Sequence, residues 1–191
     1  RKLPPGLPKS VEQDVLVTPF NDKESAEKLI KENRDELAAV IVEPVMGAAG
    51  MIPPEDDYLK FLQKVSAEND VLMIADEVIS FRLSPGGAQQ IYDFKPDLTA
   101  LGKSIGGGLP VGAFGGRKDV MAVYSPKHKH PAHHAGTFVA TPIAVAAAVA
   151  GIKELTPEAI EHINSLGWSL ADNLQKALDE LRIKAQIKGY G

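Results

Sequence analysis

The order of apolar and polar positions predicts strands that alternate with helices. Residues 38–43 (AAVIVE) form a short apolar run that ends in a carboxylate, which is the pattern of a strand buried on both faces. Residues 71–75 (VLMIA) form a second run of this kind. Between them, starting at Tyr58, apolar side chains recur at the spacing of one face of an α-helix. Strand, helix and strand in this order predict a βαβ unit with two parallel strands and a right-handed crossover.

Three further helices are expected from end signals and composition. Asn21 followed by Glu24 has the form of a capping box and predicts the start of a helix. Residues 144–152 are mostly small and apolar, which suits a helix packed closely on a neighbour. Thr156 and Pro157 are a typical cap and first-turn residue, and they predict a long amphipathic helix after them.

The later sequence extends the sheet and then changes character. Residues 98–101 and 111–114 predict two short strands around a glycine-rich turn. Near residue 155 the sequence becomes charged and amphipathic, which predicts a domain boundary. Gly167 is a weak point in the last helix, because glycine costs about 1 kcal/mol relative to alanine there. The alternating run at 183–187 resembles the start of a strand, and with the Pro-rich start that lacks methionine it indicates an excerpt of a longer protein.

Composition and charge exclude several classes of function. Lys and Arg number 21 and Asp and Glu number 25, so the net charge of −4 gives no basic footprint for nucleic acid or an anionic membrane. Cysteine is absent, which excludes disulfides, thiolate nucleophiles and cysteine-ligated metals. The longest apolar stretch, 139–152, is too short to cross a bilayer. We therefore expect a cytoplasmic protein without nucleic-acid or membrane partners.

Carboxylates end both of the predicted buried strands. Glu43 ends the first, and Asp76 and Glu77 follow the second. Because ligands bind at the carboxyl ends of parallel strands, these acids are expected at the edge of a site. The alternative, stronger for Glu77 than for Asp76, is that the carboxylate only caps the turn that follows.

Two features suggest a nucleotide hydrolase, but the pattern fails in three ways. Residues 71–77 resemble a magnesium-binding strand, and residues 102–104 (GKS) resemble the end of a phosphate loop. Such a loop needs a glycine five residues earlier, where this chain has Asp97. The two motifs also come in reverse order, and the glycines after Lys103 make a poor phosphate-binding helix.

Lys103 has a setting that suits carbonyl chemistry instead. It lies between a predicted strand and the glycines at 106–108, whose missing side chains leave room around the amine. A lysine in a tight, partly desolvated place can lose its charge and attack a carbonyl. A cofactor that combines an aldehyde with a pyridine ring needs an amine at the aldehyde and an anion at the ring nitrogen. Lys103 and Asp76 would supply these two groups.

These residues are part of a longer pattern. Residues 74–78 (IADEV), 96–97 (PD) and 101–112 (LGKSIGGGLPVG) resemble the class III aminotransferases, which are fold type I pyridoxal-phosphate enzymes. Gly136-Thr137 stands where that family has its phosphate-binding threonine. The spaced set is more specific than any one of its motifs.

The resemblance implies an α/β fold of the fold type I PLP-dependent transferases. Residues 1–155 would be the later part of the large cofactor-binding domain, which has a mainly parallel sheet with helices on both faces. Residues 156–191 would be the linking helix and the start of the small C-terminal domain.

Within the family, the details resemble the glutamate-1-semialdehyde 2,1-aminomutase branch. Ile79 stands where many transaminases have glutamine, and residues 81–82 and 86–89 also resemble that branch. Ala48 stands where ornithine and aminobutyrate transaminases carry a gating glutamate, whereas residues 139–142 (VATP) depart from the Ser-Gly-Asn-Pro of the aminomutase. The resemblance implies intramolecular amino transfer that gives 5-aminolevulinate, a step of porphyrin biosynthesis. It leaves open a class III transaminase that moves an amino group from an amino acid or amine to a keto acid.

The resemblance also implies a role for each candidate residue. Lys103 bonds to the aldehyde of pyridoxal 5'-phosphate and later carries the proton, and Asp76 pairs with the pyridine nitrogen. Val78 packs on the ring, and Glu43 lines the substrate pocket. Thr137 reaches the phosphate of the neighbouring subunit's cofactor, which implies a homodimer with a small amino-acid or amine substrate. The alternatives are a solvated surface lysine at Lys103 and a simple turn hydroxyl at Thr137.

Four of the five histidines lie within residues 128–134. This density would suit zinc, but the spacing matches no helix-face pair, and Pro126 and Pro131 predict a loop. We expect a polar loop near the mouth of the site and no metal.

A last alternative is an inactive fragment whose surface serves only in dimer contacts. The family's upstream half, with its stacking aromatic and its Ser/Gly-rich phosphate loop, has no counterpart in these 191 residues.

Overall fold

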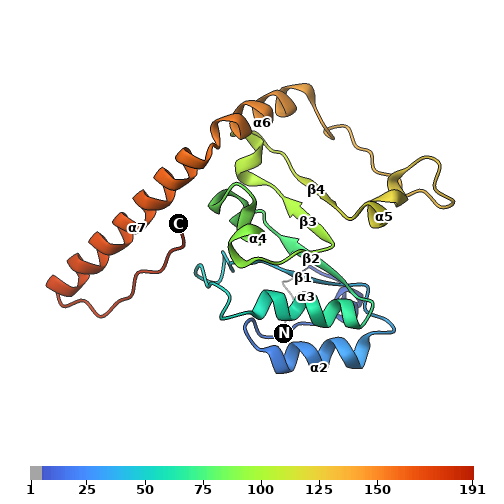
Figure 1. The fold of residues 1–191 in the computed structure, drawn as a ribbon, viewed down its shortest axis with the longest axis horizontal. Helices are drawn as coiled ribbons and strands as arrows, with labels where there is room; N and C mark the ends of the chain where they lie inside the picture. The colour runs from blue at the N-terminus through green and yellow to red at the C-terminus, as the bar shows by residue number, and fades with distance from the viewer. Residues whose placement is uncertain (1–5) are drawn as a thin grey trace.

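The computed structural model describes residues 6–191, with a four-stranded sheet at its centre (Figure 1). The Pro-rich start of the chain lies partly in residues 1–5, outside the described residues. In chain order the elements are α1 (Lys9–Gln13), α2 (Lys23–Asn33), β1 (Ala39–Val42), α3 (Tyr58–Glu68), β2 (Leu72–Asp76), the 3₁₀ turn η1 (Ser80–Leu83), α4 (Gly87–Tyr92), β3 (Leu98–Leu101), η2 (Lys103–Gly106), β4 (Ala113–Gly116), α5 (Lys118–Met121), η3 (Ala122–Tyr124), α6 (Pro142–Glu154) and α7 (Pro157–Glu180).

The sheet has the order β1-β2-β3-β4. β1, β2 and β3 run parallel, and β4 is antiparallel to β3. α3 connects β1 to β2, so the predicted βαβ unit with parallel strands is confirmed. The α/β class with a mainly parallel sheet is confirmed with it.

The apolar core lies between one face of the sheet and helices α2 and α3. Figure 1 shows the two helices side by side beneath the strands. Leu62 of α3 is 1% exposed and lies in one cluster with Ile30 of α2 and with Met73 and Ala75 of β2. Because successive side chains of a strand point to opposite faces, Asp76 lies on the face away from this core.

The core gives a direct test of the fold. Leu62→Ala is expected to lower the free energy of unfolding by about 2 to 5 kcal/mol, because it removes apolar contacts and leaves a cavity. Leu166→Ala on α7 is the control: Leu166 is 56% exposed, and a change within about 0.5 kcal/mol is expected. Urea unfolding measures both, and equal losses in the two variants would contradict this placement of the core.

The strand at 38–43 is less buried than its pattern predicted. Ile41 of β1 is 65% exposed. Helices α2 and α3 cover the opposite face, and α4 lies on that same side through hydrogen bonds of Ala88 and Gln89 to Glu77. The prediction of burial on both faces is therefore wrong for Ile41, since the described residues leave the second face of the sheet open there.

The structure confirms one of the two predicted helix caps and moves the other by one residue. Thr156 caps α7 as expected, with its Oγ1 accepting from the backbone N of Ala159 at 3.2 Å. The cap of α2 is Asp22, whose Oδ1 accepts from the backbone N of Ser25 at 3.0 Å. Asn21 was expected there, but it caps nothing in α2. Its Oδ1 accepts from the backbone N of Glu55 at 3.0 Å and so ties the loop before α3 to the start of α2.

The C-terminal segment confirms the predicted long helix but not the strand expected after it. α7 runs unbroken through Gly167, where the tail packs closely: a Cβ built on Gly167 would lie 2.6 Å from the carbonyl carbon of Gly191. The strand start expected at 183–187 is wrong, because these residues join no ladder and Ile187 donates its backbone N–H to the Gln175 side chain. The proposed boundary at 155/156 falls between α6 and α7.

Asp97 joins the strands at the edge of the sheet that lies opposite to Lys103. Asp97 Oδ2 accepts from the backbone N of Met73 at 2.7 Å, and its Oδ1 accepts from Arg117 Nη1 at 2.6 Å. Arg117 also pairs with Asp119, and hydrogen bonds to Asp119 and Asp97 raise the pKa of the Arg117 guanidinium. This cluster links β2, β3 and the end of β4.

Across residues 6–191, no helix is both long enough and apolar enough to cross a membrane.

Candidate active site

The ends of β2 and β3 bring two predicted site residues to one edge of the sheet. Asp76 is the last residue of β2 and pairs with Ala100 of β3. β3 ends at Leu101, and Lys103 follows after Gly102 as the first residue of η2. Since the two strands are parallel neighbours, Asp76 and Lys103 both lie at the carboxyl edge, where α/β sheets bind ligands.

Val78 lies close to both of these strand ends. A Cβ built on Gly102 would lie 3.3 Å from Val78 Cγ1, so the valine packs on the residue that precedes Lys103. The backbone N of Val78 donates to Asp76 Oδ1 at 3.1 Å. Turn capping therefore uses one oxygen of Asp76, whereas Oδ2 accepts no hydrogen bond from the described residues.

Lys103 has an unusual backbone conformation. Its φ is +46°, in the left-handed region that residues with a side chain rarely adopt, and its side chain is exposed. Such a conformation costs about 1 to 2 kcal/mol for a residue other than glycine. The surrounding structure must therefore hold the lysine in this geometry.

Helix α6 packs against the turn that carries Lys103. A Cβ built on Gly107 would lie 2.1 Å from the carbonyl oxygen of Ala147, and one built on Gly151 would lie 2.7 Å from Cα of Gly107. The backbones of the turn and of α6 therefore touch where no side chain fits. The predicted small-residue helix is confirmed, and its close neighbour is the lysine turn.

Gly107→Ala tests this contact. We expect it to lower the free energy of unfolding by about 1 to 3 kcal/mol, because Gly107 has φ +58° and an added methyl group would meet the carbonyl of Ala147. Gly115→Ala is a matched control, since a Cβ there meets nothing within 4 Å. Urea unfolding and hydrogen exchange of the α6 amides provide the readouts. Unchanged α6 protection in Gly107→Ala would contradict the contact.

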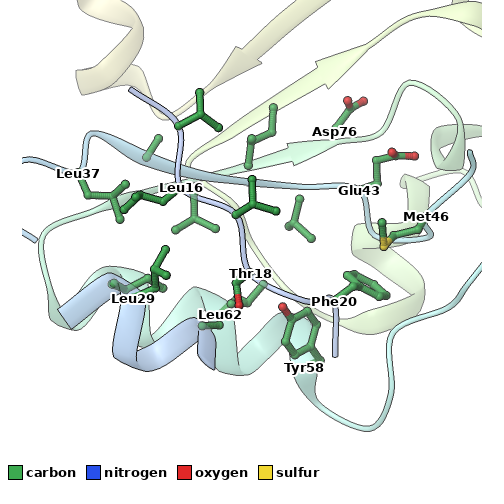
Figure 2. Close-up of a pocket in the computed structure, with 18 of the residues that line it drawn as sticks. Leu16, Thr18, Phe20, Leu29, Leu37, Glu43, Met46, Tyr58, Leu62 and Asp76 are labelled. Atoms are coloured by element: carbon green, nitrogen blue, oxygen red, sulfur yellow. The ribbon is translucent and has the colours of Figure 1, made fainter. Parts of the chain in front are cut away.

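Glu43 lies close to Asp76 at one end of a cavity of about 540 Å³ beside β1. Figure 2 shows the two carboxylates at this end and Leu29 and Leu37 at the other. Glu43 Oε2 accepts from the backbone N of Gly47 at 3.0 Å, which fixes the turn after β1. The cavity is thus mainly apolar with an acidic end.

The remaining predicted residues lie outside this cavity. Lys103 and Val78 do not line it, although both lie at the same sheet edge as Asp76. Thr137 lies in the irregular segment before α6, is exposed, and has no hydrogen bond to Asp76 or Lys103. The structure therefore brings Asp76, Val78 and Lys103 to one edge of the sheet. Glu43 lies beside Asp76, whereas Thr137 forms no hydrogen bond with Asp76 or Lys103.

The histidine cluster forms a loop, as predicted. His128 Nδ1 lies 2.9 Å from the backbone oxygen of His130, and the His134 ring lies edge-on to Phe114 at 5.5 Å between centroids. Within residues 6–191, no three His, Cys, Asp or Glu side chains are grouped so that they could hold a metal ion.

Glu77 caps the turn after β2, which confirms the alternative stated for it. Its carboxylate is 0% exposed and accepts hydrogen bonds from Ser80, Ala88 and Gln89. The sequence analysis missed Gln89 as one of these partners. The sequence indicates only which face Glu77 occupies. Side chains alternate along a strand, and Glu77 is two residues after the core residue Ala75, so it falls on the core face.

A sequence model described as aminotransferase class-III matches residues 2–191. The chain is 42% identical over 184 residues to the glutamate-1-semialdehyde 2,1-aminomutase of Methanocaldococcus jannaschii. It is 48% identical over 189 residues to that of Francisella tularensis subsp. mediasiatica. These matches cover 96% and 97% of this chain but 43% and 42% of the relatives, so the chain spans a little over two fifths of their length.

Solved structures resemble the fold over almost the whole chain. An omega-transaminase from Sphaerobacter thermophilus has a TM-score of 0.93 and 41% identity, over 98% of this chain and 43% of that one. A transaminase with PLP bound has a TM-score of 0.94 and 32% identity, over 100% and 45%. A glutamate-1-semialdehyde aminomutase from Pseudomonas aeruginosa PAO1 has a TM-score of 0.78 and 26% identity, over 92% and 40%.

Proposed function

Because the chain belongs to the class-III aminotransferase family, we propose that it supplies part of the active site of an enzyme that transfers amino groups with pyridoxal 5'-phosphate. The observation that carries the proposal is the placement of Lys103 and Asp76 at the carboxyl edge of neighbouring parallel strands, with Val78 packed against Gly102. A similar transaminase has PLP bound in its solved structure, which supports this cofactor.

The residues at the sheet edge fit this cofactor chemically. When bound, pyridoxal phosphate supplies an aldehyde that condenses with amines, with loss of water, and a protonated pyridine ring that withdraws electrons from the bonds next to it. Lys103 offers an exposed amine, and Asp76 offers a half-buried carboxylate with Oδ2 unused by the described residues. Val78 offers an apolar surface beside Gly102, which suits the face of a flat ring.

Lys103 has two tasks in this proposal. Its Nζ binds the cofactor aldehyde while no substrate is present. When a substrate amine takes its place at the aldehyde carbon, the free Nζ would carry the proton between the substrate Cα and that carbon of the cofactor. Positioned acid–base groups of this kind contribute about 10² to 10⁴ in rate.

Asp76 holds the proton on the ring nitrogen. A pair of unit charges in contact at an effective dielectric of about 20 gains about 4 kcal/mol, which equals about three pK units. The hydrogen bond from Val78 N to Oδ1 orients the carboxylate, and Oδ2 remains to face the ring.

Glu43 contributes to the substrate pocket in this proposal. It lies at the acidic end of the cavity beside Asp76, where a carboxylate would attract the amino group of a small substrate. Its hydrogen bond from Gly47 N leaves Oε1 for such a contact.

Thr137 is proposed to bind the cofactor phosphate of a second subunit. Its exposure and its separation from the hydrogen bonds of Asp76 and Lys103 are consistent with a role outside its own site. Phe138 is 87% exposed and Ile143 is 74% exposed, so the segment around Thr137 presents apolar side chains that a second copy would cover. We also propose that the protein forms a homodimer, that a domain boundary lies at 155/156 and that the protein is cytoplasmic.

The reaction we favour is the conversion of glutamate-1-semialdehyde into 5-aminolevulinate. The two aminomutases compared above, at 42% and 48% identity, support it. Transfer from an amino acid or amine to a keto acid is the second candidate. The omega-transaminase at 41% identity and TM-score 0.93 favours it, as does the departure at Val139–Pro142.

Product analysis on the full-length protein with bound cofactor separates the two reactions. With glutamate-1-semialdehyde and no keto acid, an aminomutase is expected to form 5-aminolevulinate. Amino transfer that occurs only when a keto acid is added would identify a transaminase. Cofactor binding with neither product would refute both assignments.

A further inference from the structure

Glu77 is a buried carboxylate that the proposed chemistry does not use. It directly follows Asp76 and precedes Val78, the two residues proposed to hold the cofactor ring. Glu77 is 0% exposed, and no Lys, Arg or His of the described chain forms an ion pair with it. Burial of a carboxylate without a cation is costly unless hydrogen bonds replace its water, so its hydrogen bonds need an explanation.

Four donors surround the Glu77 carboxylate. Oε2 accepts from Ser80 Oγ at 2.5 Å and from the backbone N of Ala88 at 3.0 Å. Oε1 accepts from the backbone N of Gln89 at 2.9 Å and from Gln89 Nε2 at 3.3 Å. An ionised carboxylate only accepts hydrogen bonds, so this donor set suits it on both oxygens.

The first turn of α4 closes tightly over this carboxylate. Gly87 has φ +72°, and a Cβ built on it would lie 2.7 Å from Glu77 Oε1. Only glycine lets the backbone approach so closely in this conformation. The carboxylate therefore fixes where α4 begins.

The network reaches the neighbouring strand by two routes. Gln89 Oε1 accepts from Thr99 Oγ1 of β3 at 3.3 Å. The backbone N of Glu77 donates to the carbonyl oxygen of Ala100 at 2.9 Å and so extends the pairing of β2 with β3 past Asp76. Glu77 thus joins the end of β2, the start of α4 and the strand that leads to Lys103.

We propose that Glu77 is a positioning residue for the cofactor site, which rests on the function proposed above. Asp76 and Glu77 are successive residues of an extended chain, so they point to opposite faces of the sheet. Anchoring Glu77 on the core face fixes the direction of Asp76 on the open face, and fixes Val78 over Gly102. Supporting hydrogen bonds of this kind set the geometry of the groups that touch a ligand.

Glu77→Gln is the sharpest test, because it keeps the shape and replaces one oxygen with an NH₂ donor. In either orientation that NH₂ faces the backbone N–H of Ala88 or of Gln89. We expect the dissociation constant for pyridoxal phosphate to rise about tenfold, and the visible circular dichroism per bound cofactor to change. That signal reports how the ring is held. Glu161→Gln on α7, which is exposed, is the charge-matched control and is expected to change neither quantity.

The melting temperature of the cofactor-free protein separates positioning from simple stabilisation. If Glu77 only stabilises the fold, Glu77→Gln lowers the melting temperature but leaves the dissociation constant and the dichroism per bound cofactor at their wild-type values, which overturns the proposal. Should Glu77→Gln fail to fold, Ser80→Ala carries the same test, since it removes one of the four donors. A rise of about threefold in the dissociation constant with altered dichroism is expected for it, and wild-type values would overturn the proposal.

Borohydride reduction of the wild-type protein keeps the two proposals apart. A reduced cofactor label on Lys103 in the wild type, with unchanged binding and dichroism in the Glu77 and Ser80 variants, refutes the positioning role alone. Absence of the label from wild-type Lys103 refutes the proposed function and the positioning role with it.

Discussion

In the Lys103→Ala protein, pyridoxal phosphate is expected to bind without covalent attachment, and amino transfer is expected to fall by at least about a thousandfold. The loss of activity in this variant has two causes. Under the proposed function, the variant lacks both the amine that holds the aldehyde and the group that carries the proton at the substrate Cα. Alanine at this position removes no packing from the core, since the Lys103 side chain is exposed.

Borohydride reduction followed by peptide mass spectrometry measures the attachment, and steady-state turnover measures the rate. Lys118→Ala is the control, because Lys118 is also exposed but lies on α5. It is expected to retain both the label on Lys103 and the activity. A label on a different lysine in the wild-type protein, together with an active Lys103→Ala variant, would exclude Lys103 as the anchor.

Asp76→Asn is expected to lower kcat/KM by about a thousandfold. In the proposed site, the substitution removes the charge that keeps the ring nitrogen protonated, and a loss of about 4 kcal/mol corresponds to about three powers of ten in rate. Asparagine has nearly the same shape and keeps an oxygen that can accept the hydrogen bond from Val78 N. The turn after β2 should therefore survive, so that the effect reports charge and not folding.

Steady-state kinetics and the melting temperature check this result together. Asp35→Asn provides the matched control, since the Asp35 side chain is 92% exposed and remote from the proposed chemistry. It should behave as wild type in both measurements. If Asp76→Asn kept kcat/KM within tenfold of wild type with an unchanged melting temperature, Asp76 would not be the partner of the ring nitrogen.

The parts of the fold that follow from local pattern were predictable. The apolar runs at 38–43 and 71–75 became β1 and β2 within a residue at each end, and Thr156 with Pro157 marked the start of α7. These signals are contained in a few neighbouring residues. The same holds for the site: Asp76 ends β2 and Lys103 follows β3 after one glycine, and parallel pairing then places them at a common edge.

The parts that depend on distant residues were not predictable. Asn21 has the right residue type for a cap, but its side chain is taken by Glu55, 34 positions later in the chain. Ile41 belongs to a run typical of a strand covered on both faces, yet the described residues cover only one. Within residues 6–191, the alternation at 183–187 has no neighbouring strand with which to pair.

The same limit applies around the site. The glycines after Lys103 were expected to give room to the amine, but Gly107 instead meets the backbone of α6 near Ala147. Nothing local signals that contact, because it joins segments 40 residues apart. The link from Glu77 through Gln89 to Thr99 is hidden for the same reason, since each of these residues is ordinary in its own segment.

The left-handed backbone at Lys103 has a consequence for how this position changes over evolutionary time. Glycine, and to a lesser degree asparagine, adopts such a φ more readily than lysine does. Under the function proposed above, selection for the amine of Lys103 keeps a lysine there against this preference. A lineage that had lost the reaction would therefore be expected to drift toward glycine or asparagine at position 103, and a descendant with that exchange should be as well folded as its ancestor or better.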